Sequence, residues 1–184
     1  VLSSILFLND PSKDLLEIIF SNSVKDLMDI RSKYVKADLR NPGFIRNFLM
    51  NMFKIRFYSV KNFYESNDLD GYFNQFERFF IEVLPKREAK KEPLGLRYRK
   101  RQKSPIGNVF NALLDENETK KLENIYKNDR QFRQKLEETM NLMKKGYNID
   151  EILDILDLQF STTNYEDLKE VLEMLEKHGL IEKI

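Results

Sequence analysis

The chain of 184 residues contains no cysteine and no tryptophan, and His178 is its only histidine. Without cysteine it has no disulfides, no cysteine nucleophile and no thiolate metal ligand. The glycine-rich patterns GxGxxG and GxxxxGK[ST], which cradle phosphates in nucleotide-binding proteins, are also missing from the sequence. We therefore expect a protein that is not an enzyme, with no catalytic residues, no metal site and no cofactor.

Glycine and proline are scarce as well, with six and five residues respectively. Because turns depend on these two residues, their scarcity disfavours a turn-rich all-β fold. Charged residues make up 33% of the chain and hydrophobic residues 41%, a balance typical of long solvent-facing helices around a modest core. We therefore expect an all-α protein. Residues 1–8 are apolar but too few to span a bilayer, so we expect no membrane partner.

The most apolar part of the chain runs from Phe44 to Tyr64, where thirteen positions are hydrophobic. An ordinary surface helix has one apolar stripe, whereas this predicted helix is apolar on most sides. Such a helix needs more than one neighbour. It is the central helix of a bundle, or part of it binds a partner chain. Its candidate protein-interface residues are Phe44, Phe48, Phe53, Arg56 and Phe57.

The rest of the chain up to residue 84 also has helical patterns. Residues 14–20 and 24–35 form two short amphipathic runs, and Pro42 with Gly43 marks a break before the apolar helix. From Leu69 to Leu84, apolar residues follow a regular helical stripe that is rich in phenylalanine. Eleven of the fourteen phenylalanines precede residue 81. We therefore predict a Phe-rich helical bundle over residues 1–84 that holds the main core.

A basic linker is predicted over residues 85–105, because a proline lies at each end and lysine and arginine recur throughout. A second helical domain is predicted over residues 106–184. It begins with a short helix at 108–114 and continues with a charged helix, or two helices, at 117–145. Alternation of apolar and basic residues near Tyr98 permits a short strand within the linker.

The last forty residues carry clear helix boundaries. Asn148 and Glu151 form a capping-box pattern before a helix at 149–158, and Gly179 follows a second helix at 165–177. A short strand is predicted at 180–184. Two helices joined by a turn and followed by a strand favour a winged-helix-like unit at the end of the chain.

Charge is unevenly distributed although the whole chain carries only +1. Residues 86–103 contain nine basic residues against two acidic ones, whereas residues 146–184 carry a net charge of −7. Because lysine and arginine neutralise phosphates, the basic run predicts a nucleic-acid contact in which Tyr98 stacks on a base. A solvated linker and an import signal are the alternatives. The candidate residues are Lys86, Arg87, Lys90, Lys91, Arg97, Tyr98, Arg99, Lys100, Arg101 and Lys103.

The acidic residues of the last part argue against DNA reading by its helices. The predicted helix at 165–177 is acidic on its polar side, and such a helix is repelled by the phosphates that flank the major groove. We expect His178 to interact with the carbonyl end of this helix. A second acidic group is interpreted as a solvated helix face rather than a calcium site. It consists of Asp150, Glu151, Asp154 and Asp157.

Two family resemblances concern replication proteins. The run Ile45-Arg46-Asn47-Phe48-Leu49, with residues 53–56 and 60–64, resembles the central helix of GINS subunits, and the 69–84 helix is similar to the one that follows it there. GINS subunits continue with a small β-rich domain, whereas this chain continues with helices. Pro105 and residues 144–156 are similar to helical regions of the primase large subunit, although the cysteines that hold its iron–sulfur cluster are absent.

These patterns and resemblances together predict a non-catalytic subunit or scaffold of a nucleic-acid-processing assembly, in particular of DNA replication. Apolar helices would bind other protein subunits, and the basic segment would bind DNA or RNA. We expect an intracellular location, in the nucleus or at the nucleoid. Two alternatives stay open: a winged-helix transcriptional regulator or adaptor, and an accessory subunit of a primase or polymerase.

Overall fold

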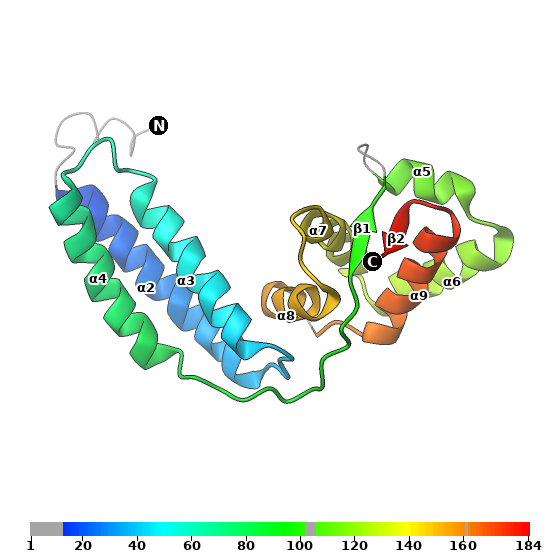
Figure 1. The fold of residues 1–184 in the computed structure, drawn as a ribbon, viewed down its shortest axis with the longest axis horizontal. Coiled ribbons are helices and arrows are strands. Elements are labelled where there is room, and N and C mark those ends of the chain that lie inside the picture. The colour runs from blue at the N-terminus through cyan, green and yellow to red at the C-terminus, as the bar shows by residue number, and fades with distance from the viewer. Residues whose placement is uncertain (1–12, 102–105, 161) are drawn as a thin grey trace. The chain divides into compact units, whose positions relative to one another are not determined.

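A computed structural model describes residues 13–101, 106–160 and 162–184, and these residues are mostly helical, which confirms the all-α class (Figure 1). The helices are α2 (Lys13–Lys36), α3 (Pro42–Tyr58), α4 (Ser66–Val83), α5 (Ile106–Leu113), α6 (Glu116–Asn128), α7 (Phe132–Lys144), α8 (Ile149–Gln159) and α9 (Tyr165–Lys177). Two short strands, β1 (Tyr98–Lys100) and β2 (Ile181–Lys183), form an antiparallel pair.

The chain divides into two compact units whose boundaries differ from the predicted ones. Of the described residues, the first unit comprises 13–36 and 42–88, and the second comprises 37–41, 89–101, 106–160 and 162–184. The segment at 37–41, which joins α2 to α3, therefore belongs to the second unit. Most of the described part of the predicted linker is also built into the second unit, because its backbone makes hydrogen bonds there.

The first unit is a three-helix bundle of α2, α3 and α4. Residues 14–20 and 24–35 belong to one continuous helix, since no proline or glycine interrupts α2 between them. The apolar stripe predicted over 69–84 is confirmed. It supplies a core of phenylalanine rings in which the Phe76 ring lies 4.7 Å from that of Phe53 and 5.4 Å from that of Phe57, centroid to centroid.

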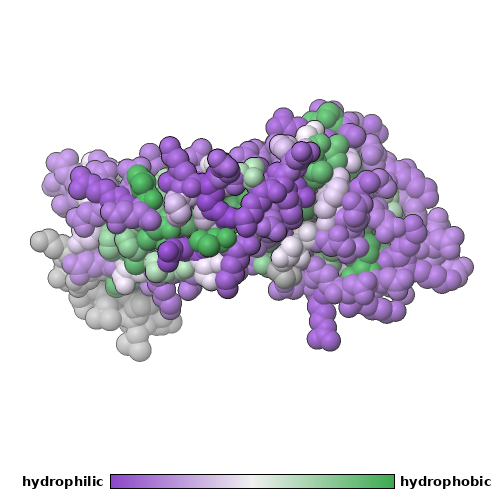
Figure 2. All heavy atoms as spheres, turned by 90° about the horizontal axis from the view of Figure 1, so that it is seen from below, coloured by the Kyte–Doolittle hydropathy of each residue, from purple (hydrophilic) through white to green (hydrophobic). Residues whose placement is uncertain are grey.

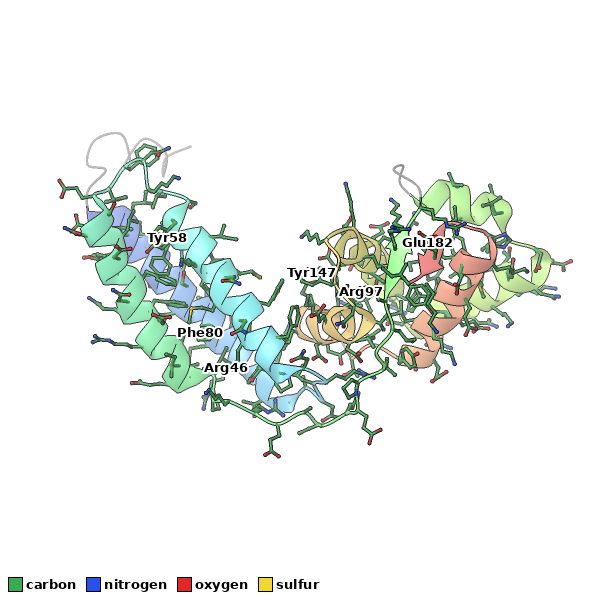
Figure 3. All side chains as sticks on the ribbon, in the orientation of Figure 1. Arg46, Tyr58, Phe80, Arg97, Tyr147 and Glu182 are labelled. Carbon is green, nitrogen blue, oxygen red and sulfur yellow. The ribbon has the colours of Figure 1, made fainter. Side chains whose placement is uncertain are left out.

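Helix α3 is shorter than the stretch that predicted it, because it ends at Tyr58 and residues 59–64 form turns. One face of α3 is buried in the bundle, with Ile45, Leu49, Phe53 and Phe57 among its residues. The basic residues avoid this core by packing at its edge. The guanidinium of Arg46, for example, lies over the Phe80 ring at 6.0 Å (Figure 3).

The second unit contains α5 to α9 and the strand pair. The capping box at Asn148 and Glu151 is present at the start of α8, with both hydrogen bonds at 2.9 Å. Gly179 has a φ of +68°, the left-handed conformation predicted for the residue after α9. A break near Asp129 separates α6 from α7, so the charged segment at 117–145 forms two helices.

Helix α8 holds non-helical parts of the second unit through two buried aspartates. The carboxylate of Asp154 accepts hydrogen bonds from the backbone N–H groups of Arg40 and Asn41 at 2.6–3.1 Å. The carboxylate of Asp150 accepts from the N–H groups of Leu94 and Gly95 at 2.9–3.0 Å. These carboxylates therefore fix the 37–41 segment and the middle of the predicted linker on one helix.

The predicted solvated face at Asp150, Glu151, Asp154 and Asp157 is wrong for Asp150 and Asp154, which are buried. Asp157 is half-buried and accepts a hydrogen bond from the Thr163 N–H at 2.7 Å. Burial raises the pKa of Asp154 and Asp157, and the backbone donors partly oppose this rise. Backbone N–H groups of neighbouring segments would lack acceptors without these carboxylates, so the carboxylates are wholly or partly buried. Helical spacing alone does not reveal this requirement.

Candidate nucleic-acid interface

The basic run has its most regular geometry at β1, where it alternates between a buried and an exposed face. Tyr98 of β1 is buried and Lys100 is half-buried, whereas Arg97, Arg99 and Arg101 are exposed. Successive side chains of a strand point to opposite faces, so the three arginines lie along one face. The backbone pairing with β2 extends to both ends, because Ile184 N–H donates to the Arg97 carbonyl and Arg101 N–H donates to the Leu180 carbonyl.

We call these three residues, Arg97, Arg99 and Arg101, the arginine ladder. Glu182 of β2 lies directly opposite Arg99 in the strand register. Its two carboxylate oxygens bind different arginines: Arg99 Nε lies 2.6 Å from Oε1 and Arg101 Nε lies 2.9 Å from Oε2. The terminal Nη2 atoms of both arginines also contact these oxygens. Figure 3 labels Arg97 and Glu182 on this strand pair.

The two arginines that bind Glu182 remain accessible. Their side chains are 68% exposed for Arg99 and 56% exposed for Arg101, against 23% for Glu182. The arginines hold the pKa of Glu182 below its usual range, with Arg99 the larger cause. In the described part of the chain, the Arg97 guanidinium has no ion-pair partner. In the arginine ladder, Arg99 and Arg101 thus share the Glu182 carboxylate, and all three guanidinium groups are accessible to solvent.

Two other basic residues of the run, Arg87 and Lys90, bind nearby groups. Arg87 belongs to the first unit, where it donates to the Tyr34 carbonyl and lies over the Tyr34 ring. Lys90 pairs with Asp38 at 3.2 Å. Lys86 is exposed, Lys91 and Lys100 are half-buried, and Lys103 lies outside the described residues. The boundary between the two units falls within the run, so Lys86 and Arg87 belong to the first unit and the other described candidates to the second.

The predicted stacking of Tyr98 on a base is wrong, because its side chain is buried. Burial raises the pKa of its hydroxyl, and the nearby Glu176 carboxylate adds to the rise. The residue fills the core side of β1 in the second unit, as an aromatic residue on the inner face of a strand usually does. A contact at this strand therefore involves guanidinium groups and no aromatic platform from Tyr98.

Several candidate interface residues on α3 are also core residues. Phe53 and Phe57 are buried in the first unit, so both are unavailable to a partner. Arg56 pairs with Asp26 at 2.6 Å and lies over the Phe53 ring. Phe44 and Phe48 are half-buried and contact each other, with ring centroids 6.0 Å apart. The sequence did not separate the two faces of α3, because apolar residues occur on both.

Exposed apolar side chains occur elsewhere on the first unit. Ile55 of α3 is 71% exposed, and Phe63 in the following turn is 68% exposed. Met52 borders a 290 Å³ groove between α2 and α3, which Asp26, Asp29 and Ile30 also line. Figure 2 shows separate apolar areas among hydrophilic side chains on this unit (green, left). Helical spacing could have identified Ile55, which lies three residues after Met52 on the outward side of α3.

A second polar cluster, which sequence reasoning missed, joins α6 to the end of α9. Glu118 accepts from Lys177 Nζ at 2.6 Å, and the His178 Nε2 lies 2.9 Å from its other carboxylate oxygen. Lys177, His178 and the Asp115 N–H together lower the pKa of Glu118 to about 2. His178 is the C-cap residue of α9, as its predicted role at the helix end requires, but its ring contacts a carboxylate.

Comparison of the chain with models of protein families, with curated proteins and with solved structures finds no match. None of the described helices is long and apolar enough to cross a membrane. Within the described ranges, no three or more histidine or acidic side chains are grouped so that they could hold a metal ion. Only the geometry and charge of the described residues therefore indicate what the candidate interface binds.

Proposed function

We propose that this chain is a non-catalytic subunit of a nucleic-acid-processing assembly, such as the DNA-replication machinery, and that it binds the phosphate backbone through the arginine ladder. The observation that carries the proposal is the exposure of Arg97, Arg99 and Arg101 at alternate positions of β1 and the two paired residues that flank it. Guanidinium groups bind phosphate oxygens through two parallel hydrogen bonds and release counterions in doing so.

The acidic surface of α9 supports a nucleic-acid contact at β1 rather than one in which α9 enters the major groove. Helices α8 and α9 and the following strand keep the helix-turn-helix-strand order of a winged-helix-like unit. However, Glu166 and Glu173 on α9 are exposed and Glu170 is half-buried, so the outer side of this helix is acidic. A helix of this charge is repelled by duplex phosphates, whereas the arginine ladder attracts them.

Binding of a partner protein is the second part of the proposal, and it involves the outward side of α3. Ile55 and Met52 are exposed there, and large apolar residues of this kind are favoured in protein interfaces. Replacing Ile55 with Asp should abolish co-purification with a partner subunit and leave the unfolding midpoint unchanged. Retained co-purification would refute this part without affecting the nucleic-acid contact.

The nucleic-acid part is tested by fluorescence anisotropy with a labelled single-stranded oligonucleotide at several salt concentrations. Three phosphate contacts predict a slope of about −2 for log K against log salt with a single strand. The triple variant Arg97→Ala, Arg99→Ala, Arg101→Ala should lose most of this slope and bind at least tenfold more weakly. A parent protein that does not bind at low salt would refute the proposal.

A matched control removes the same charge from other surfaces. Arg31 on α2, Arg78 on α4 and Arg130 between α6 and α7 are all exposed. A triple alanine variant at these positions changes the net charge by the same amount, so non-specific attraction falls equally in both variants. Equal losses of binding in the two variants would show that the arginine ladder has no special role.

A further inference from the structure

Glu182 occupies the centre of the arginine ladder. It faces Arg99 across the strand pair, and its second oxygen binds Arg101, so one carboxylate is held by two guanidinium groups. Each guanidinium binds its own oxygen of the carboxylate, and a phosphate oxygen can take the same place on either arginine. An anion-binding geometry is therefore already formed within the described chain.

The spacing of the ladder adds a second constraint. Alternate residues of a strand lie about 6.6 Å apart, so three arginines at alternate positions form a row with regular separation. This separation is close to that between successive phosphates along an extended nucleic-acid strand. Arg97 and Arg101 extend the row beyond the two ends of β1, and the paired backbone of β2 holds both flanking positions in register.

From these two features we infer that Glu182 is an internal competitor for a phosphodiester backbone, and that successive phosphates of one nucleic-acid strand replace it on Arg99 and Arg101 while Arg97 binds the next phosphate. The inference rests on the proposed function and adds the ligand class, the order of contacts and a built-in restraint on affinity. Because Tyr98 is buried, the contact reads the backbone and not the bases.

Exposure determines how strong this restraint is. Exposed ion pairs contribute little free energy, so a phosphate strand can displace Glu182 without opening the fold. The carboxylate still lowers the affinity, because the two arginines lose one partner when they gain another. Removing it should therefore tighten binding of a single-stranded oligonucleotide by roughly three- to tenfold, the range that two exposed ion pairs allow.

The test compares Glu182→Gln with Glu173→Gln in the full chain, using the anisotropy assay. Glu173 is an exposed residue of α9, so both variants remove one negative charge but only the first releases the ladder. We expect Glu182→Gln to bind three- to tenfold more tightly than the parent, and Glu173→Gln to bind within twofold of it. A larger effect of Glu173→Gln would overturn the inference.

The outcomes distinguish the inference from the proposed function. If the arginine-ladder variant abolishes binding but Glu182→Gln leaves it unchanged, the function stands and the competition is refuted. If neither the parent nor Glu182→Gln binds, both are refuted. Binding by Glu182→Gln alone would also refute both, because phosphates would then fail to replace Glu182 in the parent.

Two further measurements guard against misfolding of the glutamine variant. Glu182→Thr removes the carboxylate and keeps a residue that favours strands, so it should tighten binding by a similar factor. In the unmodified protein, the Glu182 side-chain carboxyl carbon should change its NMR chemical shift when the oligonucleotide is added. An unchanged shift at saturating oligonucleotide would overturn the inference.

Discussion

Replacing Asp154 with Asn should destabilise the second unit more than the same change at Asp157 of α8. The carboxylate is fully buried and accepts three hydrogen-bond contacts from the Arg40 and Asn41 backbone N–H groups. An asparagine keeps the shape but replaces one carboxylate oxygen with an NH2 group, so the shortest contact of either Arg40 N–H or Asn41 N–H is lost and the remaining bond loses its charged acceptor. Each hydrogen bond to a charged group contributes about 1.5–3 kcal/mol, which predicts a loss of about 2–4 kcal/mol.

Urea unfolding followed by circular dichroism measures this loss. With a typical urea m value of about 2 kcal/mol/M, the expected change lowers the midpoint of the second unit by about 1–2 M. Asp157→Asn should cost less, because Asp157 is half-buried and has one backbone donor. The solvent-facing Glu166→Gln provides the control and should leave the midpoint unchanged. Equal midpoints for Asp154→Asn and the control would refute the role assigned to the buried carboxylate.

Other predictions concern stability in each unit. Glu118→Gln should lower the free energy of unfolding by about 1–2 kcal/mol at pH 7, after allowance for solvent screening. The lowered pKa of Glu118 contributes stability above pH 4.5 that is lost as the pH falls towards 2. A pH series of urea melts should therefore show this acid-sensitive loss in the parent and not in the variant. Phe76→Ala should cost about 3–5 kcal/mol in urea unfolding, since the ring is fully buried, whereas Ile55→Ala at a mostly exposed site should change stability by less than about 0.5 kcal/mol. Gly179→Ala should lower the thermal midpoint, because an alanine is strained at a φ of +68° although space for its methyl group is open.

The sequence predicted those features that depend on local pattern. The phenylalanine stripe of α4 follows helical spacing, and the capping box at Asn148 and the left-handed Gly179 have local signatures. Each of these features is determined by residues within one or two helical turns. Predictions made from such short-range patterns therefore agree with the structure.

Features that depend on distant residues were not predictable in this way. Asp154 is 114 residues from Arg40, and only the folded second unit brings its carboxylate to that backbone N–H group. The pairing of Arg99 with Glu182 spans 83 residues and depends on the register of the strand pair. Composition correctly marked 86–103 as basic, but it could not indicate that Tyr98 turns inward while its neighbouring arginines face solvent.

The measurement that tests the central claim most directly is a side-chain NMR titration of the arginine Nε–Hε groups with a single-stranded oligonucleotide. If the arginine ladder binds phosphates, the signals of Arg97, Arg99 and Arg101 should shift together and saturate at one concentration. The signals of the exposed Arg31 and Arg78 should stay in place. Shifts at Arg31 and Arg78 equal to those of the ladder, or no shift at the ladder, would contradict the account.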